Sequence, residues 1–347
     1  MARKLGVALM IVYAAAGPAS VRGAGSSVQV VPKEADRRVD VLVDGKPFTS
    51  YIWPTSVKKP VLFPIRADGG AIVTRGFPLE PRPREHTDHP HHVGLWLNYG
   101  DVNGVDFWGN SGQAAEPGKM GVIVHRKVES AKGGDGRGEL VVSADWNVEG
   151  GRTLLTERTR YVFRAAPGLR TIDRITTLTA SGEKVVFRDT KEGMFGMRMN
   201  RALEQPATKP EVYTDASGHP TTVPVLDNEG VTGLYLSSEG KTGDAVWGTR
   251  ARWVRLAGQI EGKPVTVAIL DHPKNPGHPT YWHARGYGLF AANPMGVKDF
   301  TEGKSQLNFT IEAKQSATFT YRVLVYSAEA IPEQIETEYH RFIEGAP

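Results

Sequence analysis

Short runs of alternating apolar and polar residues recur along most of the chain, with glycine, proline and other turn residues between them. The runs are rich in β-branched and aromatic side chains, which favour strands. The predicted strands are 28–31, 38–43, 61–65, 92–99, 122–128, 139–146, 153–164, 169–178, 185–189, 251–259, 265–271, 306–311 and 318–325. Because no helices separate them, we expect antiparallel sheets packed on each other.

The C-terminus has a different period. Apolar residues recur there at helical spacing, at Ile331, Ile335, Tyr339 and Phe342. Pro332 fits the first turn of that helix. No fixed repeat or linker composition divides the chain, and the segment 200–245 is the expected long loop. The sequence therefore predicts one all-β domain over residues 25–347, a large antiparallel β-sandwich with a short C-terminal helix.

Composition agrees with a chain that buries a core. Of its 347 residues, 40% are hydrophobic and 23% are charged, which argues against a disordered or fibrous protein. The 39 glycines and 23 prolines suit many short strands joined by turns. The chain has no cysteine, which excludes disulfides, thiolate metal ligands and a cysteine nucleophile.

The N-terminus has the layout of a secretory signal peptide. Arg3 and Lys4 precede an apolar stretch, 5–16, and small residues follow. We expect residues 1–24 to be removed and the protein to be periplasmic or secreted, with no membrane partner; an uncleaved anchor is the alternative. These residues hold three of the 42 Lys and Arg side chains and no acid, so 39 basic face 38 acidic residues in the remainder. No nucleic acid partner is expected.

Four of the ten histidines lie within seven residues, at His86, His89, His91 and His92. A strand over 91–99 would place His92, Gly94, Trp96 and Asn98 on one face and His91, Val93, Leu95 and Leu97 on the other. The first face suits a sugar, whose C–H groups stack on aromatic rings while its hydroxyls need donors and acceptors. The alternative is a half-buried strand with structural histidines.

A second candidate region spans 271–294. One strand ends at Asp271, a proline-rich loop follows, and another strand begins at Trp282. In that second strand His283, Arg285 and Tyr287 share a face. Loops of this kind are often functional, although surface decoration is the alternative.

A third region, 187–198, alternates so that Arg188, Thr190 and Glu192 lie on one side, and Arg198 can join them past a glycine bend. A carboxylate among cations stays ionised, which suits a base or a substrate clamp. A structural ion pair explains the pattern equally well. Glu192 is the first candidate for a general base.

These regions resemble the bacterial PmoA-like proteins, whose domain is classed as of unknown function and often carries the label methane oxygenase. The motifs are His86-x-x-His89-Pro90-His91-His92-x-Gly94-Leu95, the run 100–108, Asp189-Thr190-Lys191-Glu192-Gly193 and Asp271-His272-Pro273…His278-Pro279…Trp282-His283-x-Arg285. The resemblance covers most of residues 50–325. A methane oxygenase subunit spans the membrane several times, whereas no mature segment here is long and apolar enough to do so.

The layout is also similar to the galactose-mutarotase supersandwich. That resemblance implies a concave sheet face that gathers histidine, carboxylate and aromatic side chains around a pyranose. It further implies histidine as acid and glutamate or aspartate as base. The expected partner is a small carbohydrate or a glycan.

The preferred function is an exported carbohydrate-active enzyme that performs epimerisation, β-elimination or hydrolysis. Glu192 or Asp271 would be the base, and His89, His92 or His283 the acid. The side chains expected to contact the sugar are Trp96, Asn98, Arg198, Trp282, Arg285 and Tyr287. A non-catalytic carbohydrate-binding surface is one alternative, and the many titratable groups make it the weaker one.

The other alternative is a sugar enzyme that depends on a divalent metal as its cofactor. His89, His91 and His283, with Asp271 or Glu192, would supply three or four ligands and leave a position for water. The spacing His89-x-His91 is credible for a ligand pair but matches no stringent zinc signature.

Overall fold

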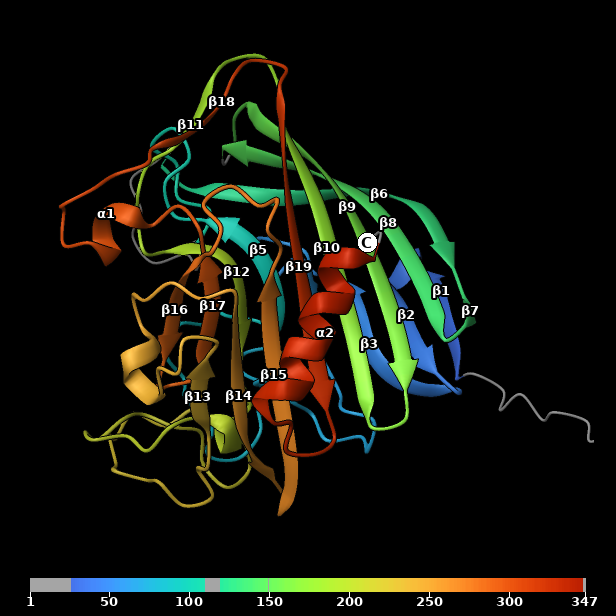
Figure 1. Ribbon diagram of the computed structural model, residues 1–347, viewed down its shortest axis with the longest axis vertical. Coiled ribbons are helices and arrows are strands. Elements are labelled where there is room, and N and C mark those ends of the chain that lie inside the picture. Colours follow the sequence, from blue (N-terminus) through green and yellow to red (C-terminus); the bar gives the residue numbers. More distant parts are fainter. Residues whose placement is uncertain (1–25, 110–118, 149, 346–347) are drawn as a thin grey trace, which may run out of the picture.

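A computed structural model describes residues 26–109, 119–148 and 150–345 (Figure 1). The chain forms two large sheets that pack face to face, together with a small two-stranded sheet. The predicted antiparallel β-sandwich is therefore confirmed. The predicted signal peptide, 1–24, lies outside the described residues.

The first sheet has nine strands and carries the candidate site. Its spatial order is β16 (Tyr281–Arg285), β17 (Leu289–Asn293), β12 (Gly193–Arg198), β5 (Leu95–Tyr99), β4 (Val61–Leu62), β3 (Lys46–Ile52), β2 (Arg38–Val43), β1 (Ser27–Lys33) and β7 (Gly134–Asp135).

The second sheet has eight strands, in the order β13 (Leu234–Ser237), β14 (Trp253–Ile260), β15 (Lys263–Asp271), β19 (Ser316–Tyr326), β10 (Leu169–Ala180), β9 (Thr153–Ala166), β8 (Arg137–Val148) and β6 (Gly121–Lys132). The small sheet pairs β11 (Val185–Phe187) with β18 (Phe309–Ile311). Three 3₁₀ turns connect strands: η1 (Glu34–Asp36), η2 (Arg201–Leu203) and η3 (Gly243–Val246).

The main core lies between the two large sheets. Leu97 and Phe195 enter it from the nine-stranded sheet, and Phe163 and Val323 enter it from the eight-stranded sheet. Alternation along each strand sends every second side chain into this core and its neighbours to the outer face. The outer faces are therefore free to carry other features.

The predicted C-terminal helix is present as α2 (Pro332–Glu344), and a four-residue helix, α1 (Val297–Phe300), precedes it. Ile335, Tyr339 and Phe342 of α2 pack on Leu270 and Leu324 of the eight-stranded sheet. Figure 1 shows α2 lying across that sheet. No helix in the described residues is long and apolar enough to cross a membrane.

The strand predicted over 92–99 begins only at Leu95. The reason is Gly94, which has φ +59° and lies so close to Leu62 that a Cβ would stand 2.2 Å from the Leu62 carbonyl oxygen. The alternation therefore starts after Gly94. Val93 consequently packs with Trp96 on the outer face, and not with Leu95 in the main core.

Candidate active site

The candidate site lies on the outer face of the nine-stranded sheet. The strand register places His283 beside Ala291, Ala291 beside Gly196, and Gly196 beside Trp96. Directly paired residues point to the same face of a sheet, so the four form one row across β16, β17, β12 and β5. A Cβ on Gly196 would be only 2.7 Å from the Trp96 ring. Glycine thus lets the indole lie flat against β12.

Four rings form a column above this row. The Tyr287 and His89 rings are stacked with centroids 5.3 Å apart, and the His89 and His92 rings with centroids 4.8 Å apart. The His92 ring in turn stacks on Trp96 at 5.2 Å. Trp108 meets both His92 and Trp96 edge-on, at 5.4 and 5.5 Å. The structure thus brings His92 and Trp96 together, as the sequence predicted, and adds His89 and Tyr287.

Asp88 binds His89, the exposed histidine of the column. Its carboxylate is hydrogen-bonded to Nδ1 of His89 and accepts hydrogen bonds from Arg75 at 2.9 Å and from Arg198 at 2.6 Å. Burial by itself would raise the pKa of Asp88. The positive charge of Arg198, the bond to His89 and the charge of Arg75 outweigh it and hold that pKa far below its usual value. Asp88 is therefore ionised.

His89 presents one ring edge to solvent. Tyr287 and His92 cover its two faces, and Asp88 occupies Nδ1, yet 43% of the side chain is exposed. The His91 ring meets the His89 ring edge-on, with centroids 5.6 Å apart, and no hydrogen bond or ion pair within the described residues engages Nε2 of His89. The backbone of His89 has φ +42°, a left-handed conformation that is uncommon outside glycine and is concentrated at functional sites. A carboxylate-oriented imidazole with a free Nε2 is the arrangement of a general base.

His91, His92 and His283 are neutral at pH 7. Burial lowers the pKa of His91 to about 3, and the charge of Lys59 adds to the effect. Burial also takes the pKa of His92 well below its usual value. His283 has a pKa of about 3, again mainly through burial, and its Nδ1 lies 2.8 Å from the Lys191 carbonyl oxygen. Because a carbonyl only accepts, Nδ1 donates there and Nε2 of His283 carries a lone pair.

Lys59 belongs to the site although nothing in the sequence indicated it. Its side chain is almost fully buried, with Nζ donating to the His91 carbonyl at 2.7 Å and lying 5.3 Å from the centroid of the Trp96 ring. Burial lowers the pKa of Lys59 to about 7, against a smaller opposing effect of Asp106. An amine of this kind gains or loses its proton near neutral pH. The local sequence could not reveal it because its contacts are tertiary.

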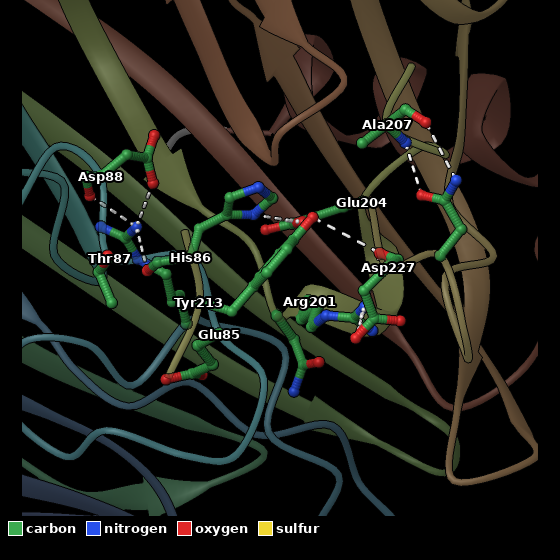
Figure 2. A network of polar contacts seen from close by, with 12 residues as sticks. Glu85, His86, Thr87, Asp88, Arg201, Glu204, Ala207, Tyr213 and Asp227 are labelled. Carbon is green, nitrogen blue, oxygen red and sulfur yellow. Dashed lines mark hydrogen bonds and ion pairs between the residues drawn. The ribbon is translucent and has the colours of Figure 1, made fainter. Parts of the chain in front are cut away.

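A pocket of about 650 Å³ opens beside the column, and Tyr287 lines it. His86 also lines it, and Figure 2 shows that side chain facing Glu204, with 2.8 Å between Nδ1 and Oε2. Both residues are buried. The ring centroids of Tyr213 and His86 are 4.5 Å apart, and the guanidinium carbon of Arg201 lies 5.3 Å from the centroid of the Tyr213 ring. This network fixes the wall of the pocket behind His86.

Two predicted site residues do not join this group. Asp271 is on β15 of the other sheet, where its carboxylate accepts hydrogen bonds from Asn275 at 2.7 Å and from the Thr280 amide at 2.9 Å. It also binds His278 Nδ1 at 2.7 Å, so it fixes the loop that follows β15. Asp271 is therefore not placed to act as the base.

Trp282 does not face the site either. Its indole is fully buried in the main core and donates to the Ala251 carbonyl at 2.9 Å. Alternation along β16 explains this position, because His283 and Arg285 take the outer face. Stacking of Trp282 on a substrate is incompatible with that burial.

The remaining predicted residues have positions of their own. Glu192 immediately precedes β12, and its Oε1 lies 3.3 Å from Nζ of its neighbour Lys191. Its described hydrogen bonds and ion pairs reach no histidine of the column. Asn98 donates to the Phe107 carbonyl at 2.6 Å and so fixes the loop that carries Trp108. Arg198 is buried against Asp88, and Arg285 is exposed at the pocket.

The predicted metal ligands are not gathered as a ligand set. In the parts of the chain that the structure describes, no three histidine, aspartate or glutamate side chains are arranged to hold a metal ion. Nδ1 of His89 is engaged by Asp88, and Nδ1 of His283 by a backbone carbonyl. The geometry gives the metal hypothesis no support.

Comparisons with known proteins give one family and several solved structures. The model of a family of unknown function, DUF6807, matches residues 38–340. This agrees with the predicted domain of unknown function, while the PmoA-like resemblance itself stays a prediction. A comparison with curated proteins finds no match.

Three of the similar solved structures are sugar-related. One is the galactosidase domain of an alpha-galactosidase-sucrose kinase, with 8% identity, a TM-score of 0.40 and coverage of 86% of this chain and 42% of that one. Another is a galactose mutarotase-like protein from Clostridium acetobutylicum, with 9% identity, a TM-score of 0.38 and coverage of 87% and 99%. The third is a galactose 1-epimerase from Lactobacillus acidophilus, with 10% identity, a TM-score of 0.36 and coverage of 88% and 100%.

Proposed function

The chain belongs to the family of unknown function DUF6807, which names no reaction, and we propose from the site itself that it is an exported enzyme acting on a sugar or sugar derivative. Proton transfer at Nε2 of His89 is the central step. The observation that carries this proposal is the Asp88–His89 pair, in which the carboxylate binds Nδ1 of a partly exposed imidazole that is held between two stacked rings.

The pair works as an oriented base. Nε2 of His89 takes a proton from the substrate, and the imidazolium that forms is stabilised by the Asp88 carboxylate at Nδ1. Arg75 and Arg198 keep that carboxylate ionised, so it remains an acceptor and holds the ring in one tautomer. The same Nε2 returns the proton in the second half of the reaction. His89 therefore serves as base and acid in turn.

The other candidate acids and bases take different roles. His92 and His283 have lowered pKa values and are neutral, so they do not supply the proton as acids at pH 7. His92 instead forms the back wall of the His89 ring. Of the two carboxylates first considered as bases, Glu192 is the one next to the nine-stranded sheet, immediately before β12, and its described ion-pair partner is Lys191.

The pocket supports a sugar as the substrate. Its volume, about 650 Å³, lies within the range typical of small-molecule sites. Trp247 supplies an aromatic surface for C–H groups, and His86 and Gln205 supply polar atoms for hydroxyls. Tyr287, which lines the pocket, borders the catalytic pair, because its ring stacks directly on His89. Export rests on the sequence of residues 1–24 alone.

The test follows proton transfer directly. The protein is incubated in D₂O with aldoses, ketoses, uronates and glycosides, and ¹H NMR records C–H exchange and new products. Epimerisation next to a carbonyl group exchanges a C–H with solvent, and β-elimination gives new vinyl signals. Epimerisation at the anomeric carbon and hydrolysis change the anomeric signals without C–H exchange. We expect turnover of at least one sugar, reduced about 100-fold or more in His89→Gln.

His219 provides the matched control. It is a highly exposed histidine whose Nδ1 lies 3.6 Å from Asp215, a second His–Asp pair outside the site. His219→Gln should leave turnover unchanged. Turnover that survives His89→Gln at the same rate as His219→Gln would refute the assignment of His89.

A further inference from the structure

The pocket beside the ring column is lined by three segments that meet at its mouth. They are the hairpin turn after β16 with Arg285, the loop after η2 with Gln205, and the end of η3 with Trp247. The register places Arg285 beside Leu289 and Leu289 beside Arg198, all on the outer face. Arg285 thus lies two strand spacings, about 10 Å, from the arginine that holds Asp88.

Arg285 is stacked but has no acid partner. Its guanidinium carbon lies 5.5 Å from the centroid of the Trp247 ring, and no carboxylate in the described residues pairs with it. Arg250 also lies over an aromatic ring, but its donors are used within the protein. It covers Tyr281 at 5.2 Å, but its Nε donates to the Pro279 carbonyl at 2.8 Å and a terminal nitrogen donates to the Gly277 carbonyl at 3.0 Å. The donors of Arg285 remain available to a ligand.

Trp247 and Gln205, two residues that line the pocket, each have a buried polar atom without a hydrogen-bond partner in the described protein. Nε1 of Trp247 is a buried donor, and Oε1 of Gln205 is a buried acceptor. Nε2 of Gln205 donates to Asp244 at 2.8 Å, which fixes the orientation of the amide. The pocket therefore offers donors beside Arg285 and an acceptor from Gln205.

The pocket also contains acidic residues, whose negative charges oppose the binding of an anion. Asp244 and Glu211 line it together with Lys209 and Arg285, so the formal charges of the four cancel. Attraction of an anion must therefore come from the local geometry at Arg285. The guanidinium of Arg285 lies over the Trp247 indole and presents its N–H groups as a planar fork, which matches the two oxygens of a carboxylate.

We propose that this pocket binds the carboxylate of an acidic sugar, a uronic or aldonic acid, through Arg285 stacked on Trp247. The inference rests on the proposed function and narrows its substrate class. The carboxylate would bind at Arg285, a sugar hydroxyl would donate to Gln205, and the ring would lie beside Tyr287 near His89.

The test compares glucuronate with glucuronamide, which has the same ring but no charge, by isothermal titration calorimetry. We expect glucuronate to bind about tenfold or more tightly to the unmodified protein, because a hydrogen-bonded charge adds that much discrimination. Arg285→Gln should remove the difference between the two ligands. Arg250→Gln should retain it, and circular dichroism checks that both variants fold.

The outcomes separate the two proposals. Equal affinity for glucuronate and glucuronamide in the unmodified protein, or discrimination that persists in Arg285→Gln, overturns the acidic-sugar inference and leaves a neutral sugar site standing. Glycolate that binds as tightly as glucuronate would show a carboxylate site without selectivity for a sugar ring, which overturns the acidic-sugar inference. Binding of none of the three probes overturns it too, whereas the proposed function is refuted only if the NMR assay shows no turnover of any sugar class.

Discussion

Asp88 obtains its role from two arginines that are distant in the sequence. Arg198 is 110 positions away and Arg75 is 13 away, yet both donate to the same carboxylate. The histidine cluster from His86 to His92 indicates a functional region. The contact of His92 with Trp96 is expected from strand alternation, but it arises through the turn at Gly94, because the strand begins only at Leu95. The sequence could not single out Asp88 or Lys59, because their burial and partners exist only after the sheet has formed.

Asp88→Asn tests the charge between these arginines. We expect the free energy of unfolding at pH 7 to fall by about 3 kcal/mol, because two buried guanidinium groups lose their counter-charge. The folded pKa of Asp88 lies below its unfolded value of about 3.9. The stabilisation by Asp88 is therefore present above about pH 4 and is lost as the pH falls below it.

Urea unfolding of both proteins between about pH 3 and pH 7 measures this difference. The gap between the unmodified protein and Asp88→Asn should narrow toward the acid end. A gap that stays constant over the whole range would show that the carboxylate is not stabilised by its ionised state.

At the level of elements, strand patterns were predictable and strand starts were not. The long strands β9 and β10 follow directly from their alternation, and α2 follows from its helical period. The start of β5 depends on Gly94, whose positive φ is imposed by the close approach of Leu62. A glycine in a run of apolar residues does not reveal from sequence alone which side of it the strand occupies.

Gly196→Ala tests the row across β12. The added methyl group would meet the Trp96 ring at 2.7 Å, so the indole must move and the column above it must shift. We expect a loss of about 1 to 3 kcal/mol in stability, a changed near-ultraviolet circular dichroism spectrum and reduced turnover. Gly182→Ala is the control, since nothing lies within 4 Å of a Cβ there. Identical spectra for the two variants would contradict this account of the row.

At the scale of the whole molecule, the site and α2 lie on opposite outer faces of the sandwich. The ring column is on the nine-stranded sheet, and α2 covers the eight-stranded sheet. The main core separates them, and the sequence predicted that two-layer arrangement because it contained strands without intervening helices. Which face would carry the chemistry could not be predicted, since it depends on the register between strands far apart in the chain.

Phe342→Ala separates stability from chemistry. Phe342 is buried between α2 and the eight-stranded sheet, so its truncation should lower the free energy of unfolding by about 3 kcal/mol. Turnover per folded molecule should remain unchanged, because the site is on the other face. Thermal denaturation and the NMR assay measure the two quantities, and Ile331→Ala, at an exposed position, is the control. If turnover fell by much more than the fraction of folded protein, the two outer faces of the sandwich would be coupled.

The separation along the chain of the residues in the ring column affects when the column forms during folding. His89, His92 and Trp96 are close in sequence, but Tyr287 and Arg198 reach them only by closing loops of roughly one hundred to two hundred residues. Contacts between such distant segments slow the folding of sheet proteins. The complete ring column is therefore a late product of folding, and a nascent chain that has already formed its local hairpins still lacks it.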